Sequence, residues 1–530
     1  MNIKSNYVDI ENRKIFPCEI TIEDKKIKSI KKINQKCENY ILPGFIDAHI
    51  HIESSMLPPS EFARLAVIHG TVATVSDPHE IANVLGIRGV EFMIENSKST
   101  NFKIFFGASP CVPATLFETS GAVLGVKEIK ELLEKKEIKY LSEVMNFPGV
   151  INGDKEIIAK IKVAKEMRKP IDGHAPGLRG EALTKYINAG ISTDHESFSY
   201  DEAKEKLEKG MKIIIREGSA AKNFEALHPL IDEYYEKMMF CSDDRHPDDL
   251  KKGHINDLVK RAVKYKHDVF NVLQMACINP IRHYNLEVGM LREGDFADFI
   301  IVKDLENFEI LQTWINGEMV AKEGKTLLSS KKYEILNNFN TSLKKEEDFY
   351  LPECNTKRVI EVVDKELITH KKELKKDKDI LKIAVINRYK DAPVKGLGYI
   401  KGFGLKEGAI ASSVAHDSHN VVVVGCDDYS IMKAANTIIK NKGGICAYTK
   451  EKTLFLNLDI AGLMSSKDGF KVAEKYEEIN NFVKNELNSP LTSPFMTLSF
   501  MALLVIPELK VSDKGLFDVT KFDFTDVCVD

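Results

Sequence analysis

The feature that most constrains this chain is a series of eight short strand-like segments that alternate with longer helical patterns between residues 44 and 283. Such alternation is typical of βα units, which build a parallel sheet. Eight units are the number that a (β/α)8 barrel requires. The strands are expected to end near His51, Asp77, Ser109, Glu143, His174, His195, Glu217 and Asp243. The sequence therefore predicts a TIM-like barrel over residues 44–283.

A chain of 530 residues is longer than one barrel needs, so we expect further domains. Residues 1–43 and 284–330 both contain short strand-like runs, and together they predict a composite β-sandwich. Residues 331–378 are rich in Lys, Glu and Asn and are predicted to form a connection that includes a charged helix. Residues 379–530 carry an α+β pattern. The predicted fold class is α/β, with a barrel, a composite β-sandwich and a C-terminal α+β domain.

Composition limits the partners of the protein. Lys and Arg number 75 against 79 Asp and Glu, a net charge of −4 without a long block of one sign, so neither nucleic acid nor a membrane surface is expected as a partner. The nine cysteines form no Cys-x-x-Cys pair and no signal peptide is recognised, which predicts a reduced, cytoplasmic protein. With two accessory domains around a barrel, we expect a homo-oligomer, in its simplest form a dimer.

Side chains able to bind metal recur where the predicted strands end. His49 and His51 are one residue apart, so on a strand both imidazoles lie on one face. The carboxyl ends of barrel strands open on one face, where residues distant in sequence converge. The candidate ligands are His49, His51, Glu143, His174, His195 and Asp243.

Six ligands exceed the needs of one ion, so two divalent cations bridged by Glu143 and a water are expected. Imidazole and carboxylate suit Zn, Fe or Mn rather than Ca, and such ions lower the pKa of a bound water. A single His or Asp at a strand end can instead cap a helix or satisfy a backbone group. Six of them at strand ends make coincidence a poor explanation.

The stretch Pro43-Gly-Phe-Ile-Asp-Ala-His-Ile-His51 resembles the first-strand signature of the amidohydrolase superfamily, and His174, His195 and Asp243 follow in that superfamily's order. Residues 289–298 resemble its return into the β-sandwich. A more specific set comprises residues 51–56, 76–83, 143–149, 172–177, 216–219 and 241–249. This set resembles the adenine deaminase family of bacteria and archaea, and residues 416–420 resemble its C-terminal domain, so the likeness covers nearly the whole chain.

The resemblance implies hydrolysis of the small molecule adenine to hypoxanthine and ammonia in purine salvage. It also implies that Glu143 bridges the two metal ions in place of the carboxylated lysine of many relatives. Mn or Fe are the implied occupants, while the ligand chemistry also permits Zn.

Adenine C6 becomes electrophilic when N1 is protonated or hydrogen-bonded, so the site needs an acid and a base. Glu143 and Asp243 are the predicted catalytic carboxylates at the metals, with Asp243 taking the proton of the attacking water. His79 and Glu80 are predicted to pass a proton to the leaving ammonia. Asp77 or Glu53 could serve instead, and Asp77 before Pro78 also fits a helix N-cap.

Purine recognition is assigned to Arg216, Glu217, Ser219, Asp244 and Asp77. Buried polar groups that pair with ring nitrogens discriminate strongly between bases. Two alternatives remain open. Arg216 could simply form an ion pair with Glu217 or another carboxylate, and the loop with His416 and His419 is either a lid near the barrel mouth or a turn held by Asx hydrogen bonds.

Two other functions compete with this interpretation. One is an amidohydrolase that acts on a cyclic amide or a different amino-heterocycle with the same metals. The other is a binding protein that has lost metal and activity. Such proteins lack one or more ligands, and here all six candidates are present.

Overall fold

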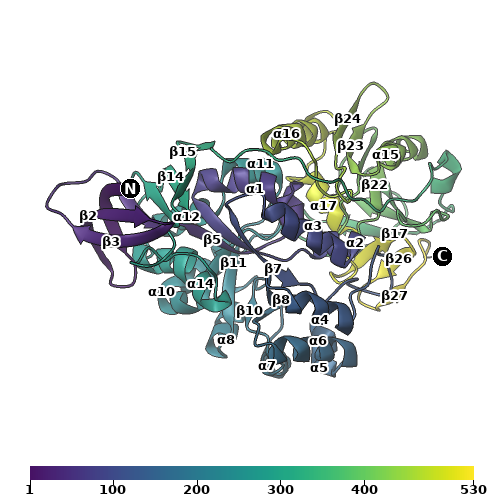
Figure 1. Ribbon diagram of the computed structural model, residues 1–530. Coiled ribbons are helices and arrows are strands. Elements are labelled where there is room, and N and C mark those ends of the chain that lie inside the picture. Colours follow the sequence, from purple (N-terminus) through teal and green to yellow (C-terminus); the bar gives the residue numbers. More distant parts are fainter. Residues whose placement is uncertain (530) are drawn as a thin grey trace.

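The computed structural model describes residues 1–529, and Asp530, the last residue of the predicted third domain, lies outside the described residues. The molecule is elongated (Figure 1). A β-sheet that carries the N-terminus occupies one end, a barrel lies in the middle, and a mixed region of sheet and helices that carries the C-terminus occupies the other end.

The central region is the predicted barrel. Its strands are β5 (Phe45–Ile50), β6 (Thr71–Ser76), β7 (Lys103–Ala108), β8 (Ile138–Val144), β9 (Ile171–Gly173), β10 (Thr193–Asp194), β11 (Lys212–Arg216) and β12 (Met238–Cys241). β5 to β9 are joined in parallel, and so are β10 to β12. Ser192 N donates to Ile171 O at 2.9 Å, and Asp243 N donates to His49 O at 3.0 Å. The first bond joins the β9 end to the β10 end and the second joins the β12 end to β5, so the two groups of strands close into a barrel. The predicted fold class is confirmed.

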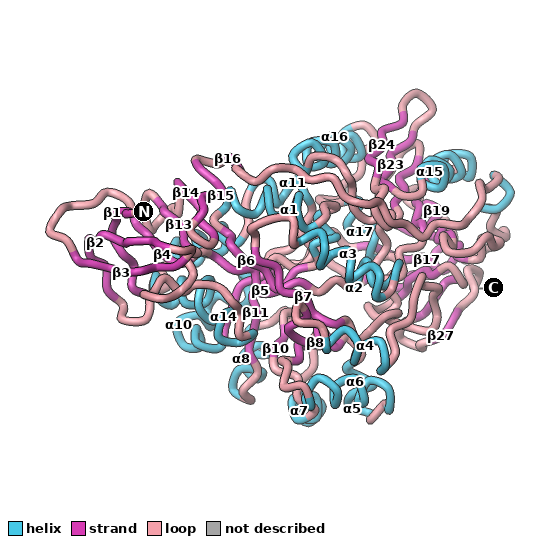
Figure 2. The backbone as a smooth tube through the Cα atoms, viewed as in Figure 1, coloured by secondary structure: helices cyan, strands magenta, loops and turns pink. Residues whose placement is uncertain are grey.

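The barrel strands form because they are short apolar runs buried on both faces, as parallel sheets require. Every residue of β6, Thr-Val-Ala-Thr-Val-Ser, is buried. Helices surround the strands (Figure 2). The longer ones are α1 (Pro59–Ala66), α3 (Ile87–Ser97), α4 (Val126–Glu134), α6 (Lys155–Glu166), α7 (Gly180–Asn188), α8 (Tyr200–Glu208) and α12 (Ile255–Lys264). The strand ends therefore meet at one rim, where loops carry the polar residues.

One sheet combines strands from both flanks of the barrel. Its members are β1 (Asn2–Asp9), β2 (Lys14–Glu23), β3 (Lys26–Lys32), β4 (Tyr40–Pro43), β13 (Phe299–Val302), β14 (Ile310–Ile315), β15 (Glu318–Lys322) and β16 (Lys325–Thr326). Their order is β16-β15-β14-β13-β4-β1-β2-β3. β4 thus joins the two flanks, because it pairs parallel with β1 and antiparallel with β13.

The C-terminal region contains a second eight-stranded sheet, in the order β18-β17-β20-β19-β22-β21-β23-β24. Its strands are β17 (Lys357–Val362), β18 (Thr369–Leu374), β19 (Leu381–Ile386), β20 (Gly396–Lys401), β21 (Ala409–Ser412), β22 (Val421–Gly425), β23 (Gly444–Tyr448) and β24 (Thr453–Asn457). Helices α15 (Asp428–Asn441), α16 (Gly469–Asn485) and α17 (Pro494–Phe500) and a small sheet of β25 (Leu509–Ser512), β26 (Gly515–Asp518) and β27 (Asp523–Phe524) complete it.

The structure corrects the prediction for residues 331–378. This segment contains no α-helix among its described residues, only a 3-10 turn at Glu346–Phe349, and β17 and β18 belong to the C-terminal sheet. β17 pairs parallel with β20, and its apolar residues Val359, Ile360 and Val362 are buried, so this strand is part of the C-terminal core. The lysines that suggested a connection lie on the partly exposed hairpin of β17 and β18.

Two further features bear on the cysteines and on membranes. Cys354 and Cys528 form a disulfide, which the cysteine spacing did not predict, while the other seven cysteines are free. Within residues 1–529, no helix combines the length and apolar character needed to cross a bilayer.

Candidate metal centre and active site

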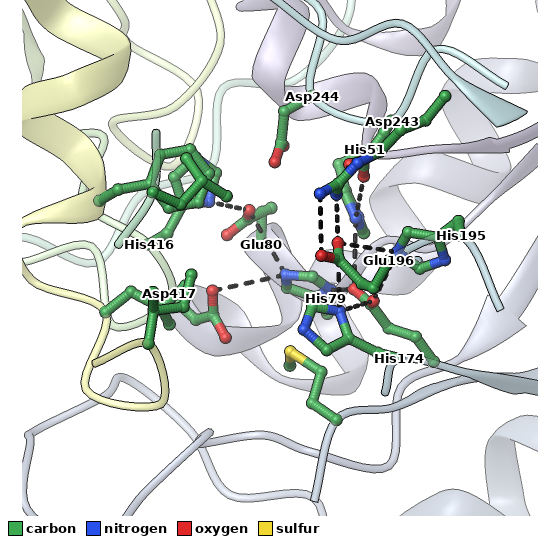
Figure 3. Close-up of a pocket in the computed structure, with 17 residues that line it drawn as sticks. His51, His79, Glu80, His174, His195, Glu196, Asp243, Asp244, His416 and Asp417 are labelled. Atoms are coloured by element: carbon green, nitrogen blue, oxygen red, sulfur yellow. Dashed lines mark hydrogen bonds and ion pairs between the residues drawn. The ribbon is translucent and has the colours of Figure 1, made fainter. Parts of the chain in front are cut away.

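Glu143, near the end of β8, lies within ion-pair distance of three of the predicted histidine ligands, His51, His174 and His195. Figure 3 shows these three histidines converging on one spot. Glu143 Oε2 lies 2.8 Å from His174 Nδ1 and 3.2 Å from His195 Nε2. Its Oε1 lies 3.3 Å from His51 Nε2. The two oxygens of one carboxylate therefore face different imidazoles, as a bridging ligand requires.

Asp243 organises the second half of the cluster. Its Oδ1 lies 3.4 Å from His51 Nε2 and 3.6 Å from His49 Nε2. The His49 ring stacks on His195, with centroids 4.1 Å apart. Asp243 has φ of 51°, a left-handed conformation that Asp tolerates better than most residues. Hydrogen bonds to His49 O and from His51 N hold this backbone in place, so β5 fixes where the carboxylate points.

The donor set suits divalent metal ions. Several groups have potential ligand atoms within 4.8 Å of one another, among them His49, His195 and Asp243; Glu143, His174 and His195; and His51, Asp77, His79 and Glu143. His195 Nε2 is buried and faces two carboxylates, with Glu143 Oε2 at 3.2 Å and Glu196 Oε1 at 3.5 Å. Imidazole and carboxylate without thiolate suit a catalytic rather than a structural site. All six predicted ligands lie in this cluster.

Neighbouring positive charges keep the carboxylates of Glu143 and Asp243 ionised. Burial would raise the pKa of Glu143, but His174 beside it and hydrogen bonds from histidines hold the pKa well below its usual value. For Asp243, burial is outweighed by the Arg216 guanidinium, whose Nη1 lies 2.7 Å from Asp243 Oδ2, so its pKa is also well below the usual value. Both groups are therefore anionic near neutral pH, the form that binds cations.

The second strand delivers His79 and Glu80 to the same cluster. His79 Nδ1 lies 3.1 Å from Asp77 Oδ2 and 3.3 Å from Glu143 Oε1, and its Nε2 lies 3.4 Å from Glu80 Oε1. Burial would lower the pKa of His79, yet the carboxylates of Glu80 and Asp77 raise it well above its usual value. His79 thus sits as a cation between acceptors, able to give or relay a proton.

Asp77 is predicted to bind substrate or to cap a helix, and the structure shows neither role. Its carboxylate accepts from Ser109 Oγ and bonds His79, and it does not line the cavity. At the start of α2 (His79–Leu85), no side chain of the N-cap residue makes a bond, whereas Glu53 Oε1 accepts from Ile81 N at 3.1 Å. Asp77 orients His79 instead, because the strand end places it behind that ring.

The loop with His416 to His419 reaches the barrel mouth, which resolves the alternatives left open by the sequence. His416 Nδ1 and His419 Nε2 both bond the carboxylate of Glu80. Asp417 Oδ1 lies 3.7 Å from His79 Nε2. Figure 3 shows His416 and Asp417 facing Glu80 and His79 from the side of the C-terminal region. The C-terminal region therefore supplies part of the site.

Arg216 and Asp244, both predicted to bind substrate, line the cavity. Arg216 also pairs with carboxylates, since its Nη2 donates to Glu196 Oε2 at 2.8 Å while Nη1 faces Asp243. Glu196 lines the cavity too and was missed by the sequence prediction. Its position directly after His195 at a strand end is the signal that could have identified it.

Glu217 and Ser219, also predicted to bind substrate, do not line the cavity. Glu217 faces the outside of the barrel, where its carboxylate pairs with Arg261 of α12 at 3.0 Å and with Lys222 at 3.2 Å. Ser219 Oγ donates to Asp249 Oδ2 and accepts from His246 N, so it holds a turn. The residue after Arg216 points away because successive strand residues alternate faces.

The barrel with a His- and carboxylate-rich cluster at its carboxyl rim defines a metal-dependent hydrolase of the amidohydrolase class. The Amidohydrolase family model matches residues 40–320, and the Adenine deaminase C-terminal domain model matches residues 355–523. The chain belongs to the adenine deaminase family.

Curated relatives agree with this assignment over the full length. The chain is 63% identical over 532 residues to a protein of Sulfurovum sp. (strain NBC37-1) named adenine deaminase, covering 100% of both. It is 54% identical over 542 residues to the adenine deaminase of Borreliella burgdorferi, with 99% of each covered. It is 52% identical over 548 residues to that of Methanosarcina mazei, covering 99% of this chain and 98% of that protein.

Proposed function

We propose that this protein hydrolyses free adenine at C6 to hypoxanthine and ammonia, as a step of purine salvage. The observation that carries the proposal is the single cluster in which Glu143 faces His51, His174 and His195 while Asp243 faces His49 and His51. Membership of the adenine deaminase family supports adenine as the substrate.

His49, His51, His174, His195 and Asp243 would hold two divalent ions with Glu143 between them. Mn or Fe are favoured and the donor set also admits Zn. Such a pair, when bound, lowers the pKa of a coordinated water so that it becomes nucleophilic near neutral pH.

The protein's own residues then move protons. The water oxygen forms a bond to C6 and the C6–N bond to the amino group breaks, while one water proton ends on ammonia and the other on N1. Asp243, kept ionised by Arg216, accepts a proton from the water. His79 delivers a proton to the departing amino nitrogen, held in position by Asp77 and Glu80.

Arg216 and Asp244 bind the edge of the purine, since both line the cavity. Ser54 Oγ donates to Asp244 Oδ1 at 2.5 Å and so fixes this carboxyl at the cavity, while burial raises its pKa above the usual value. We further propose that the enzyme works in the cytoplasm as a homodimer.

The test is an assay of the Mn-loaded protein with adenine, following hypoxanthine and ammonia, beside a Glu143→Gln variant with its metal content measured. Glutamine keeps the shape of residue 143 but removes its charge, so we expect loss of about one metal ion and at least a hundredfold loss of kcat. Wild-type protein that holds two ions yet leaves adenine unchanged would contradict the substrate. Ring opening of a cyclic amide without ammonia would then favour the alternative amidohydrolase, and a protein that takes up no metal would favour the non-catalytic one.

A further inference from the structure

The cavity at the metal centre has two chemically different sides. The barrel contributes almost only charged and polar groups to it, with Met145 as the apolar exception. The other four apolar lining residues all come from the C-terminal region. They are Leu367, Phe500, Leu503 and Ile506, which we call the apolar wall.

Phe500 is the aromatic member of the wall and its orientation is fixed. Its ring stacks on His416 with centroids 4.6 Å apart and planes inclined by 15°. His416 in turn bonds Glu80 of the barrel. The stack therefore places an aromatic ring of the C-terminal region beside the cavity, and Phe500 is only 4% exposed.

A purine ring needs an apolar surface against its face. Flat heteroaromatic bases bind with their edges on polar groups and their faces on aromatic or apolar side chains. The polar side chains of the barrel can bind the edge of a base, whereas the apolar wall can cover its face. The cavity has a volume of about 30 Å³, enough for about two or three waters and too small for a purine. The part of the wall other than Phe500 must therefore move aside for the base to enter.

The segment that bears Leu503 and Ile506 is suited to that movement. It lies between the end of α17 and the start of β25 and contains turns rather than helix or strand. Leu367 lies in a similar turn between β17 and β18.

We propose that the apolar wall, with Phe500 at its centre, closes on the face of the purine ring and is the element that determines base binding. This inference rests on the proposed function, because it assumes a purine substrate. Phe500 and its neighbours are thus substrate-positioning residues contributed by the C-terminal region.

The test compares Phe500→Leu with Phe495→Leu in the metal-loaded enzyme. Phe495 lies in the same helix and is buried, but it packs near Tyr476 and does not line the cavity. For Phe500→Leu we expect KM for adenine and the Kd for hypoxanthine, measured by calorimetry, to rise about tenfold, which is about 1.4 kcal/mol. The value of kcat should fall less than about threefold, because the metal ligands and His79 are untouched, and Phe495→Leu should change neither binding constant.

An unchanged KM and Kd in Phe500→Leu, or an equal rise in Phe495→Leu, overturns the proposal. If Phe500→Leu does not fold, Leu503→Ala in the turn tests the same wall, with an expected rise of about threefold in both constants. Failure of the wild type to deaminate adenine would refute the proposed function separately. In that case the Kd of the wild type and of Phe500→Leu for hypoxanthine would still test whether the apolar wall binds a purine. A wild type that does not bind hypoxanthine would overturn the inference as well.

Discussion

Replacing Lys510 by methionine should stabilise the protein at low pH and leave its stability almost unchanged at high pH. Lys510 in β25 is completely buried, and its ammonium donates to one carbonyl oxygen, that of Leu367, at 2.9 Å. Burial lowers its pKa from 10.5 to about 7, and within residues 1–529 no carboxylate offsets this effect. The charged form is therefore costly in the folded state.

The pKa difference sets the size and the pH window of the effect. Each pKa unit corresponds to about 1.4 kcal/mol, so protonated Lys510 costs up to about 5 kcal/mol of folding free energy. Below pH 7 both folded and unfolded chains carry the proton and the full cost applies. Between pH 7 and 10.5 only the unfolded chain keeps it, so the stability of the wild type rises with pH and the cost disappears above 10.5. Loss of the bond to Leu367 offsets roughly 1 kcal/mol.

Differential scanning calorimetry of wild type and Lys510→Met at pH 6 and pH 9.5 measures this. We expect the variant to be more stable by about 2 to 4 kcal/mol at pH 6, a rise in Tm of roughly 2 to 4 °C for a chain of this length, and the difference to shrink to within about 1 kcal/mol at pH 9.5. Lys206→Met is the matched control. Lys206 is equally buried but bonds Asp194 at 2.9 Å and Glu202 at 2.7 Å, so its removal should destabilise by about 3 to 5 kcal/mol. A Lys510→Met variant whose stability relative to wild type does not change with pH would refute the reasoning.

Two further predictions concern the site and the disulfide. Arg216→Gln removes the charge that lowers the pKa of Asp243, so we expect kcat to fall at least tenfold. The acid limb of the pH–kcat profile should move to higher pH, because the pKa of Asp243 rises when the guanidinium is lost. An acid limb at the wild-type pH would contradict this role. Cys354→Ser opens a link between residues 174 apart and should lower stability by about 2 to 5 kcal/mol in thermal unfolding while kcat at 25 °C stays unchanged. The same loss should follow from dithiothreitol on the wild type, and a wild type insensitive to the reductant would count against the bond.

The metal cluster could be predicted from the sequence because parallel strands impose a simple rule. Residues at the carboxyl ends of β5, β8, β9, β10 and the segment after β12 must meet at one rim, so His49, Glu143, His174, His195 and Asp243 converge whatever the loops between them do. The rule needs only strand order and period, and both are local properties of the sequence.

Other parts of the site depend on geometry that no local pattern contains. Glu217 follows Arg216, yet one faces out and the other in, and only the exact end of β11 decides which. The sequence pattern of a helix cap at Asp77 was misleading, because Glu53, which follows another strand, accepts the hydrogen bond from Ile81 N in the first turn of α2. The bonds from His416 and His419 to Glu80 join residues more than 330 positions apart and exist only because two domains dock.

The position of β4 in the shared sheet has a consequence for biosynthesis. β4 pairs on one side with β1, which is made about 30 residues before it, but its other partner, β13, leaves the ribosome roughly 260 residues later. At about 5 to 20 residues per second, one edge of the nascent N-terminal sheet stays open for roughly 10 to 50 seconds. During that time the exposed edge can pair with other chains, so the whole barrel must be synthesised before the first domain of the protein can be completed.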